Sequence, residues 1–330
     1  MKKLLLAALI CIAAAARSQN VGVTAINLEN IGYPYPVNFL DVAIEGNTYQ
    51  MAYMDVKPEK PNGKTVVLLH GKNFCGAYWG QTAKTLAELG YRIIIPDQIG
   101  FGKSSKPEHL QYSFQMLANN TRLILDELGI MKATIVGHSM GGMLATRFAL
   151  MFPEATEKLV LENPIGLEDW QQKVPYKPID WWYENEMAAT YESIKDYQLT
   201  NYYGGNWKPE YDQWLDIQAG WTKNQNYKII AWNSALTYDM IFTQPVCYEF
   251  YQLQVSTLLI IGQRDRTALG KNLVSPDIAS TMGDYPELGK KTASLIPGST
   301  LVELDNVGHL PHIEDFNKFI APLKEFLKKP

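Results

Sequence analysis

The sequence predicts an α/β protein whose core is a doubly wound, mostly parallel sheet with a helical cap inserted between two strands. Short apolar runs rich in Val and Ile alternate along the chain with segments of helical period. A long aromatic segment without a strand-like run interrupts this alternation after residue 163. A glycine-rich turn that carries a serine lies between one apolar run and the helical segment after it.

Seven segments have the length and composition of strands. An alternating stretch at residues 49–57 comes first. The six later runs are apolar on both faces, as strands buried in a parallel sheet are. They lie at residues 64–70, 91–96, 133–136, 158–161, 256–261 and 299–304.

Four segments of helical period lie between or after these runs, at residues 78–89, 113–128, 140–152 and 313–327. Ser113 is a suitable N-cap, and Gly90 and Gly129 follow the ends of the first two segments. The alternation of strands and helices predicts a doubly wound sheet. In such sheets the chemistry collects at the carboxyl ends of the strands, so we expect the functional residues there.

The segment from residue 163 to about residue 255 breaks the pattern. It contains seven of the eight tryptophans of the chain. It is too long for a simple connection and too aromatic for a disordered one. We therefore expect core residues 19–163, a helical cap at 164–250 that lies over the sheet, and core residues 251–330.

The first residues have the pattern of an export signal. A short positive start at residues 1–3 precedes an apolar run at 4–16 that is too short to span a bilayer, and small residues follow. We expect a signal peptide at residues 1–18, a periplasmic or secreted protein, and no stable membrane insertion after cleavage. Cys75 and Cys247 then remain, either as a pair or as free thiols.

The net charge argues against one class of partner. The formal charge is −4 and the pI is about 5.8. No basic region suited to a phosphate backbone is present, so we expect no nucleic-acid partner.

The serine turn is the first candidate for chemistry. Gly137-His-Ser139-Met-Gly141 lies between the run at 133–136 and the helix at 140–152. A nucleophile on a strand-to-helix turn needs small neighbours, because the turn is strained and the backbone packs closely. The start of the following helix also favours a developing negative charge. These features predict that Ser139 is a nucleophile.

A serine hydroxyl needs a base to accept its proton, and the chain has five histidines. His138 adjoins the serine, His70 ends an earlier strand, and His109 lies in a polar loop. His309 and His312 remain, just after the last strand. We expect His309 to be the base, because it directly follows Gly308 and the strand end, with His312 as the alternative.

A carboxylate must orient the base and stabilise its charged form. Asp265 follows the strand at 256–261 and gives the chain order Ser, Asp, His that is known for serine nucleophiles on such a turn. Glu162, at the end of the strand at 158–161, is the alternative. Asp97 and Asp305 are interpreted as a loop brace and a turn residue.

Backbone amides are expected to form the oxyanion hole. Met140 follows the nucleophile and supplies one amide. The other comes from the loop after His70-Gly71, with Lys72 preferred and Asn73 as the alternative. In the alternative interpretation, His70-Gly71 is only a turn that ends the strand and has no part in the oxyanion hole.

Together, these motifs resemble those of the α/β-hydrolase superfamily over nearly all of the mature chain. The matching residues are His70-Gly71, Asp97-x-x-Gly100-x-Gly102-x-Ser104, Gly137 to Gly142, Gly262-x-x-Asp265 and Gly308-His309. The resemblance implies an α/β-hydrolase fold, a catalytic set of Ser139, Asp265 and His309, a small-molecule substrate, and neither a metal nor a cofactor.

The insertion looks like the cap of the epoxide hydrolase, haloalkane dehalogenase and carbon–carbon hydrolase branches. The first two carry Asp at the nucleophile position, whereas this chain has Ser139. The resemblance therefore implies an esterase, with lactone or carbon–carbon hydrolysis and perhydrolysis as alternatives. The same fold also serves as a ligand receptor with weak turnover.

Overall fold

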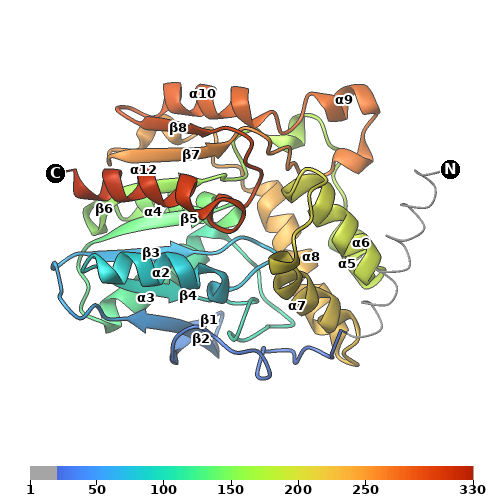
Figure 1. Ribbon diagram of the computed structural model, residues 1–330. Coiled ribbons are helices and arrows are strands. Elements are labelled where there is room, and N and C mark those ends of the chain that lie inside the picture. The colour runs from blue at the N-terminus through green and yellow to red at the C-terminus, as the bar shows by residue number, and fades with distance from the viewer. Residues whose placement is uncertain (1–20, 330) are drawn as a thin grey trace.

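A computed structural model describes residues 21–329. They form one sheet in the order β1-β2-β4-β3-β5-β6-β7-β8 (Figure 1). Strands β3 to β8 run parallel, whereas β2 is antiparallel to both β1 and β4. The strands are β1 Val37–Ile44, β2 Asn47–Val56, β3 Thr65–Leu69, β4 Arg92–Pro96, β5 Ala133–His138, β6 Thr156–Glu162, β7 Thr257–Gly262 and β8 Thr300–Leu304.

The doubly wound, mostly parallel sheet confirms the predicted fold class, and each of the seven predicted strands has a counterpart in β2 to β8. Strand β1 was not predicted. It lies at the edge of the sheet, and only Val42 and Ile44 of its side chains are buried, so it contains no apolar run. Glu45 and Gly46 join it to β2 with positive φ angles of 50° and 78°, as tight hairpins require.

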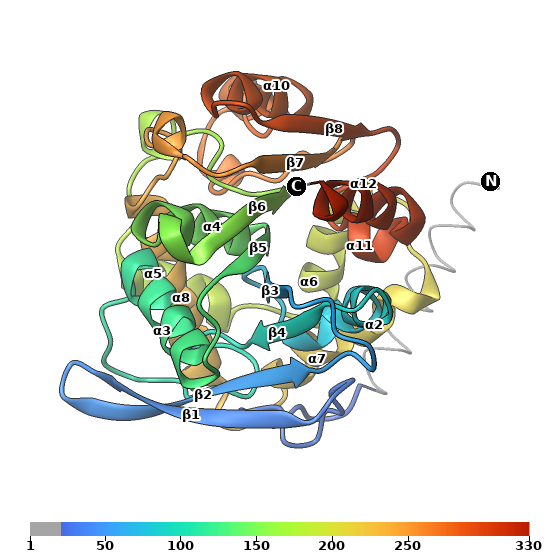
Figure 2. The same ribbon diagram turned by 90° about the vertical axis from the view of Figure 1, so that its left-hand side faces the viewer.

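Helices cover both faces of the sheet (Figure 2). Alternate residues of β3 divide between two apolar cores, with Val67 and Leu69 in one and Val66 and Leu68 in the other. Side chains of α3, α4 and α10 pack in the first core, and those of α2 and α12 in the second. These helices are α2 Gly80–Glu88, α3 Phe114–Glu127, α4 Met140–Met151, α10 Tyr285–Leu295 and α12 Phe316–Lys328, with the short α9 Pro276–Ser280 and α11 Pro311–Glu314 beside them.

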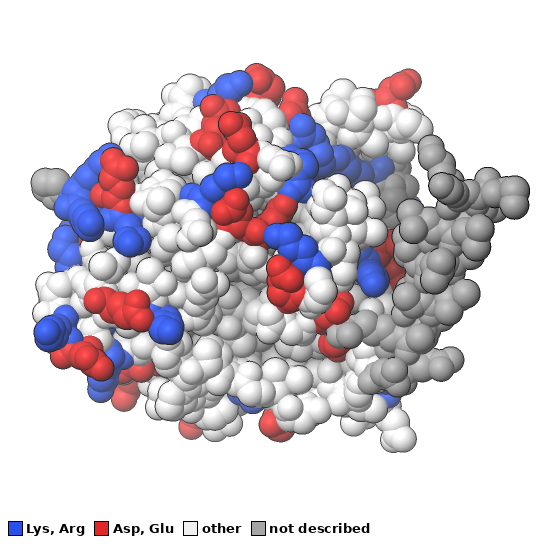
Figure 3. All heavy atoms as spheres, viewed as in Figure 1, with Lys and Arg blue, Asp and Glu red and all other residues white. Residues whose placement is uncertain are grey.

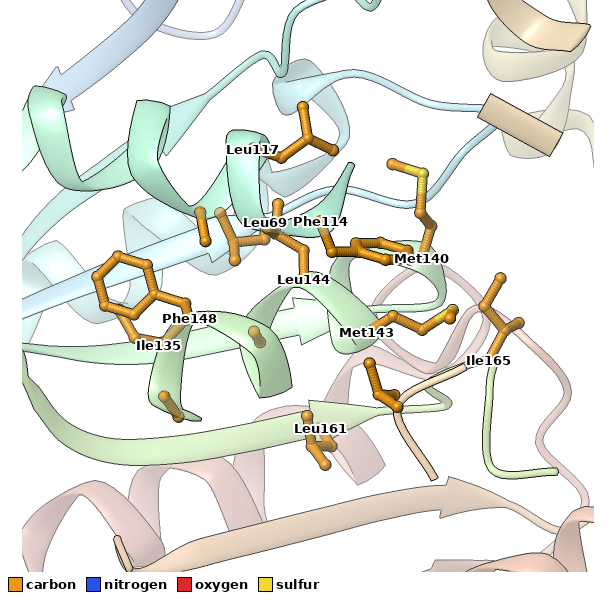
Figure 4. Close-up of a cluster of buried hydrophobic side chains, with 14 of the residues drawn as sticks. Leu69, Phe114, Leu117, Ile135, Met140, Met143, Leu144, Phe148, Leu161 and Ile165 are labelled. Atoms are coloured by element: carbon orange, nitrogen blue, oxygen red, sulfur yellow. The ribbon is translucent and has the colours of Figure 1, made fainter. Parts of the chain in front are cut away.

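The first core fixes α4, the helix that follows Ser139. Figure 4 shows Leu144 and Phe148 of α4 between the strands and α3. Both side chains are fully buried. Each such side chain stabilises the fold by about 1.5–3 kcal/mol relative to an exposed one. The start of α4 is therefore held firmly against the carboxyl end of β5.

Four helices lie together beside the sheet, between β6 and β7 in sequence (Figure 1). They are α5 Ile179–Met187, α6 Tyr191–Tyr197, α7 Asp212–Thr222 and α8 Tyr227–Thr243, and a π-helical turn, Gln198–Tyr202, extends α6. Helices α5 and α8 pack through stacked rings of Trp182 and Tyr238, whose centroids are 4.8 Å apart. We call residues 164–250 the cap. Short 3-10 turns complete the chain at Gly76–Trp79, Pro153–Ala155, Trp170–Gln172, Pro209–Tyr211, Phe250–Gln252 and Lys271–Leu273.

The first described residues bind the cap. Thr24 N donates to the carbonyl of Gly220 over 3.1 Å, and the Trp221 indole donates to the carbonyl of Ala25 over 2.9 Å. The predicted signal peptide, residues 1–18, lies outside the described residues. Between residues 21 and 329, no helix is both long and apolar enough to span a membrane.

Charged side chains of both signs are interspersed over the face shown in Figure 3. Cys75 and Cys247 are both free thiols. Among residues 21–329, no group of three or more His, Cys, Asp or Glu side chains is arranged to hold a metal ion.

Candidate active site

Ser139 occupies a strained turn between β5 and α4. Its φ and ψ angles are 55° and −121°, a conformation that a residue with a side chain rarely adopts. A Cβ atom added to Gly137 would lie 2.0 Å from the carbonyl oxygen of Gly141, and one added to Gly141 would lie 2.3 Å from that of Leu69. The turn can therefore form only with glycine on both sides of the serine.

A continuous hydrogen-bonded chain joins Ser139, His309 and Asp265. The Ser139 hydroxyl lies 3.0 Å from His309 Nε2, and His309 Nδ1 donates to Asp265 Oδ2 over 2.6 Å. His309 and Asp265 are almost fully buried, and Ser139 is 7% exposed. The structure thus brings together the three side chains singled out from the sequence, in the arrangement that activates a serine.

Asn163 holds the carboxylate in place, and sequence reasoning missed it. Its amide group donates to Asp265 Oδ2 over 2.6 Å and to the carbonyl of Gly308 over 3.2 Å, and its side-chain oxygen accepts from Gly262 N. It is fully buried, with a φ angle of 36°. Asn163 directly follows Glu162, which ends a predicted strand. This position was the one feature of the sequence that could have pointed to a role for Asn163 in the site.

Glu162 does not contact His309. Its Oε1 accepts from the backbone amide and from Nδ1 of His312, over 2.9 and 2.8 Å. The His312 ring stacks on Trp79 with a centroid distance of 4.3 Å. The two alternatives, Glu162 and His312, therefore form a second carboxylate–histidine pair that is separate from Ser139.

His70 and His138 brace the loops around the site. His70 Nδ1 donates to the carbonyl of Gly71, and its Nε2 accepts from Gln98 N. His138 Nε2 donates to the carbonyl of His309 over 2.7 Å, and its Nδ1 accepts from the Tyr78 hydroxyl. Burial lowers the pKa of both imidazoles, so they remain neutral.

The loop after β3 passes beside the serine. A Cβ atom on Gly71 would lie 3.1 Å from the Cβ of Ser139. Met140 is the first residue of α4, where a backbone amide has no partner within the helix, and the Lys72 amide forms no hydrogen bond to another backbone group of residues 21–329. These two amides are therefore free for an oxyanion. The Asn73 side chain instead donates to the Tyr202 hydroxyl over 2.8 Å.

Tyr202, on the π-helical turn of the cap, covers the base. Its ring stacks on that of His309 with a centroid distance of 4.9 Å, and its carbonyl accepts from His309 N over 3.2 Å. Burial raises the pKa of its hydroxyl, which stays neutral. Sequence reasoning did not identify this residue, because nothing in the local pattern of the cap places it over His309.

Comparison with known protein families identifies the fold of the chain. The family described as "alpha/beta hydrolase fold" matches residues 64–316, which is most of the chain. The chain belongs to the α/β-hydrolase family.

Relatives within this family carry different activities. A haloalkane dehalogenase of Mycobacterium marinum is 29% identical over 45% of this chain and 54% of its own length. A 2-hydroxy-6-oxo-6-phenylhexa-2,4-dienoate hydrolase of Comamonas testosteroni is 27% identical over 67% of this chain and 82% of its own. The structure of a probable hydrolytic enzyme from Pseudomonas aeruginosa PAO1 is 50% identical, covers 94% of this chain and 99% of its own, and superposes with a TM-score of 0.92.

A cavity lies between the cap and the core. Its volume is about 350 Å³, and its lining includes Lys72, Phe101 and residues of α5 to α8. Of the seven cap tryptophans, only Trp221 lines it, alongside Tyr197, Tyr227 and Tyr238. Together with Phe74 and Phe101, these four rings form the aromatic part of the cavity wall.

Proposed function

We propose that this hydrolase cleaves small or medium esters through an acyl-enzyme formed on Ser139. The observation that carries the proposal is the hydrogen-bonded chain from the Ser139 hydroxyl to His309 and Asp265. A serine becomes nucleophilic when a base at this distance accepts its proton. The cavity of about 350 Å³ is large enough for a small substrate.

In the first half of the reaction, Ser139 Oγ attacks the ester carbonyl carbon while His309 Nε2 accepts the hydroxyl proton. The amides of Lys72 and Met140 stabilise the oxyanion that forms. The tetrahedral intermediate then collapses, the bond to the alcohol oxygen breaks, and His309 returns its proton to that oxygen. The acyl group remains on Ser139.

In the second half, His309 accepts a proton from water, whose oxygen attacks the acyl carbon. Collapse of this intermediate releases the acid and returns the proton to Ser139. Asp265 keeps the imidazole in the correct tautomer in both halves. Its carboxylate also accepts from Asn163 and from Thr267 N, and these hydrogen bonds stabilise its negative charge.

Carbon–carbon hydrolysis is the second candidate. It is favoured by the similarity to the Comamonas testosteroni dienoate hydrolase over most of that protein's length. Such a reaction would also use Ser139, so a Ser139 variant alone does not separate the two functions.

A panel of phenyl esters, a lactone and a vinylogous 1,5-diketone separates them. Ester turnover by the wild type, absent in Ser139→Ala, is the expected result. Ser280→Ala, on the exposed α9, serves as a matched serine control and should retain full activity. Turnover of the diketone without measurable ester turnover would contradict the esterase proposal.

We also propose that the protein is exported, on the basis of the signal pattern in residues 1–18. Mass spectrometry of the protein from its native cells should find a mature chain that begins near Gln19. An intact N-terminal methionine would contradict this proposal.

A further inference from the structure

The side chain of Lys72 extends from the core into the cap. Its Nζ lies 2.6 Å from the Ser234 hydroxyl on α8 and 3.4 Å from the centroid of the Tyr238 ring. Lys72 also lines the cavity. An ammonium group has three donors, and one hydroxyl and one ring do not satisfy all of them. A molecule bound in the cavity can therefore accept a hydrogen bond from Lys72.

Among the described residues that line the cavity, only Lys72 has a positively charged side chain. Its ionisable lining residues are Lys72, Glu186 and three tyrosines, Tyr197, Tyr227 and Tyr238. Burial raises the pKa of each tyrosine, so all three are neutral. Glu186 interacts with the Tyr238 hydroxyl. Among the described residues, it is the one carboxylate whose charge acts noticeably on Lys72, and it forms no ion pair with it.

The ammonium lies close to the reaction centre along the chain. Gly71, the preceding residue, approaches Ser139 so closely that an added Cβ would lie 3.1 Å from the serine Cβ. From Gly71, which lies beside the nucleophile, one peptide unit and the lysine side chain lead to the ammonium. Ser139 itself is not among the residues that line the cavity, so a substrate held there has to extend from the Lys72 side chain past Gly71 to place its carbonyl at the serine.

We propose that the cavity binds esters that carry a carboxylate, and that the Lys72 ammonium binds this carboxylate. The inference rests on the proposed esterase function and specifies its substrate class. A partly buried ammonium without a paired carboxylate is costly, and an anionic substrate supplies the missing partner. One ammonium balances the single charge of one carboxylate. Lys72 then contributes twice, with its backbone amide at the oxyanion and its side chain at the substrate.

Binding to Ser139→Ala tests this inference without turnover. Two matched pairs place the charge on either side of the ester: 4-butanoyloxybenzoate with its methyl ester, and monophenyl adipate with methyl phenyl adipate. Calorimetry should show that at least one acidic member binds more tightly than its methyl ester. Adding Lys72→Met should weaken binding of that acidic ester by about 10- to 100-fold, the range for a lost hydrogen bond to a charged group. Lys72→Arg should restore part of the affinity.

The variant Glu186→Gln gives a second test. It changes a residue of α5, so its result does not depend on whether the Lys72→Met protein folds correctly. Removing this negative charge should tighten binding of the acidic ester a few-fold and leave its methyl ester unchanged. The inference is overturned if neither acidic ester binds better than its methyl ester, or if Lys72→Met and Glu186→Gln both leave the acid-to-methyl affinity ratio within twofold. Turnover of the same esters by the wild type reports separately on the proposed function. Acid-selective binding without any ester turnover would contradict the esterase proposal and leave the binding of the carboxylate by Lys72 intact.

Discussion

The carboxyl edge of the sheet and the cavity under the cap position their side chains in different ways. At the edge, Asp265 accepts hydrogen bonds from His309, Asn163 and Thr267 N, each between 2.6 and 2.8 Å. Both oxygens of this carboxylate therefore have fixed partners on the loops that follow β6, β7 and β8. Small displacements at this edge therefore break hydrogen bonds that the proposed reaction needs.

The cavity has a different construction. Its walls combine aromatic and aliphatic side chains of α5 to α8 with polar ones, and hydrogen bonds from Lys72 Nζ to Ser234 and from the Gln218 amide to the carbonyl of Asn73 join core to cap there. Apolar contact is non-directional and tolerates changes of shape better than a hydrogen-bonded chain does. From this comparison we infer that the proposed chemistry depends on the edge and that substrate selection depends on the cavity.

The largest effect is expected from His309, compared with its counterpart His312. Both are buried, and both donate to a carboxylate, Asp265 or Glu162. His309→Gln should lower kcat by about 10⁵-fold or more, because no base remains for Ser139. His312→Gln should lower Tm by several degrees and leave kcat within about tenfold. Steady-state kinetics and thermal melts of both variants check this, and equal losses of kcat would erase the distinction between the two pairs.

The carboxylates should show the same contrast with a smaller effect. Asp265→Asn should lower kcat by about 10⁴-fold, because the amide favours the wrong tautomer of His309. Glu162→Gln should have a far smaller effect on kcat. Reversed results would place the acid of the catalytic set at the end of β6 instead of β7.

Asn163→Ala should lower kcat about 10- to 100-fold, as expected when the Asp265 carboxylate loses a buried hydrogen bond. The pH profile separates a positioning role from general destabilisation. With one donor fewer, the carboxylate attracts the charged imidazole more strongly. The acid limb of kcat/KM should therefore move upward by about half a pH unit or more. A lower Tm with an unmoved acid limb would mean that Asn163 only supports the fold.

The edge could be predicted from the sequence because each of its main residues follows a strand end within a short local motif. Ser139, Asp265 and His309 are of this kind. Asn163 also follows a strand, but a single Asn carries no distinctive pattern. The positions of Tyr202 over His309 and of the Lys72 side chain in the cavity could not be predicted from the sequence, because they depend on contacts between distant segments. Lys72 contacts Ser234, 162 residues away, and only the folding of the cap brings them together.

The pH dependence of KM tests the role of the cavity, as distinct from that of the edge. Burial lowers the pKa of Lys72 to about 8, so the ammonium is charged below this pH and neutral above it. If Lys72 binds a carboxylate, KM for an acidic ester should rise about tenfold between pH 7 and pH 9. The tyrosines around the cavity stay neutral over this range, with the pKa of Tyr197 raised to about 12. KM for the matched methyl ester should stay level; a parallel rise would assign the effect to another group.

The smallest effects are expected within the cap. Ile230 lines the cavity, whereas Trp181 packs against Trp182 inside the cap. Ile230→Ala should change the ratio of kcat/KM between a bulky and a small ester about five- to tenfold. Trp181→Ala should lower Tm by several degrees and affect both esters alike. If Ile230→Ala also left the ratio unchanged, substrate selection would lie outside this cavity.

Labelling with a fluorophosphonate tests the central claim most directly, because the probe forms a bond only with an activated serine. The account predicts one covalent adduct per chain, mapped by peptide mass spectrometry to Ser139. It also predicts strongly reduced labelling in His309→Gln and none in Ser139→Ala. An unlabelled wild type, or an adduct that persists in Ser139→Ala, would contradict the claim that Ser139 is the nucleophile.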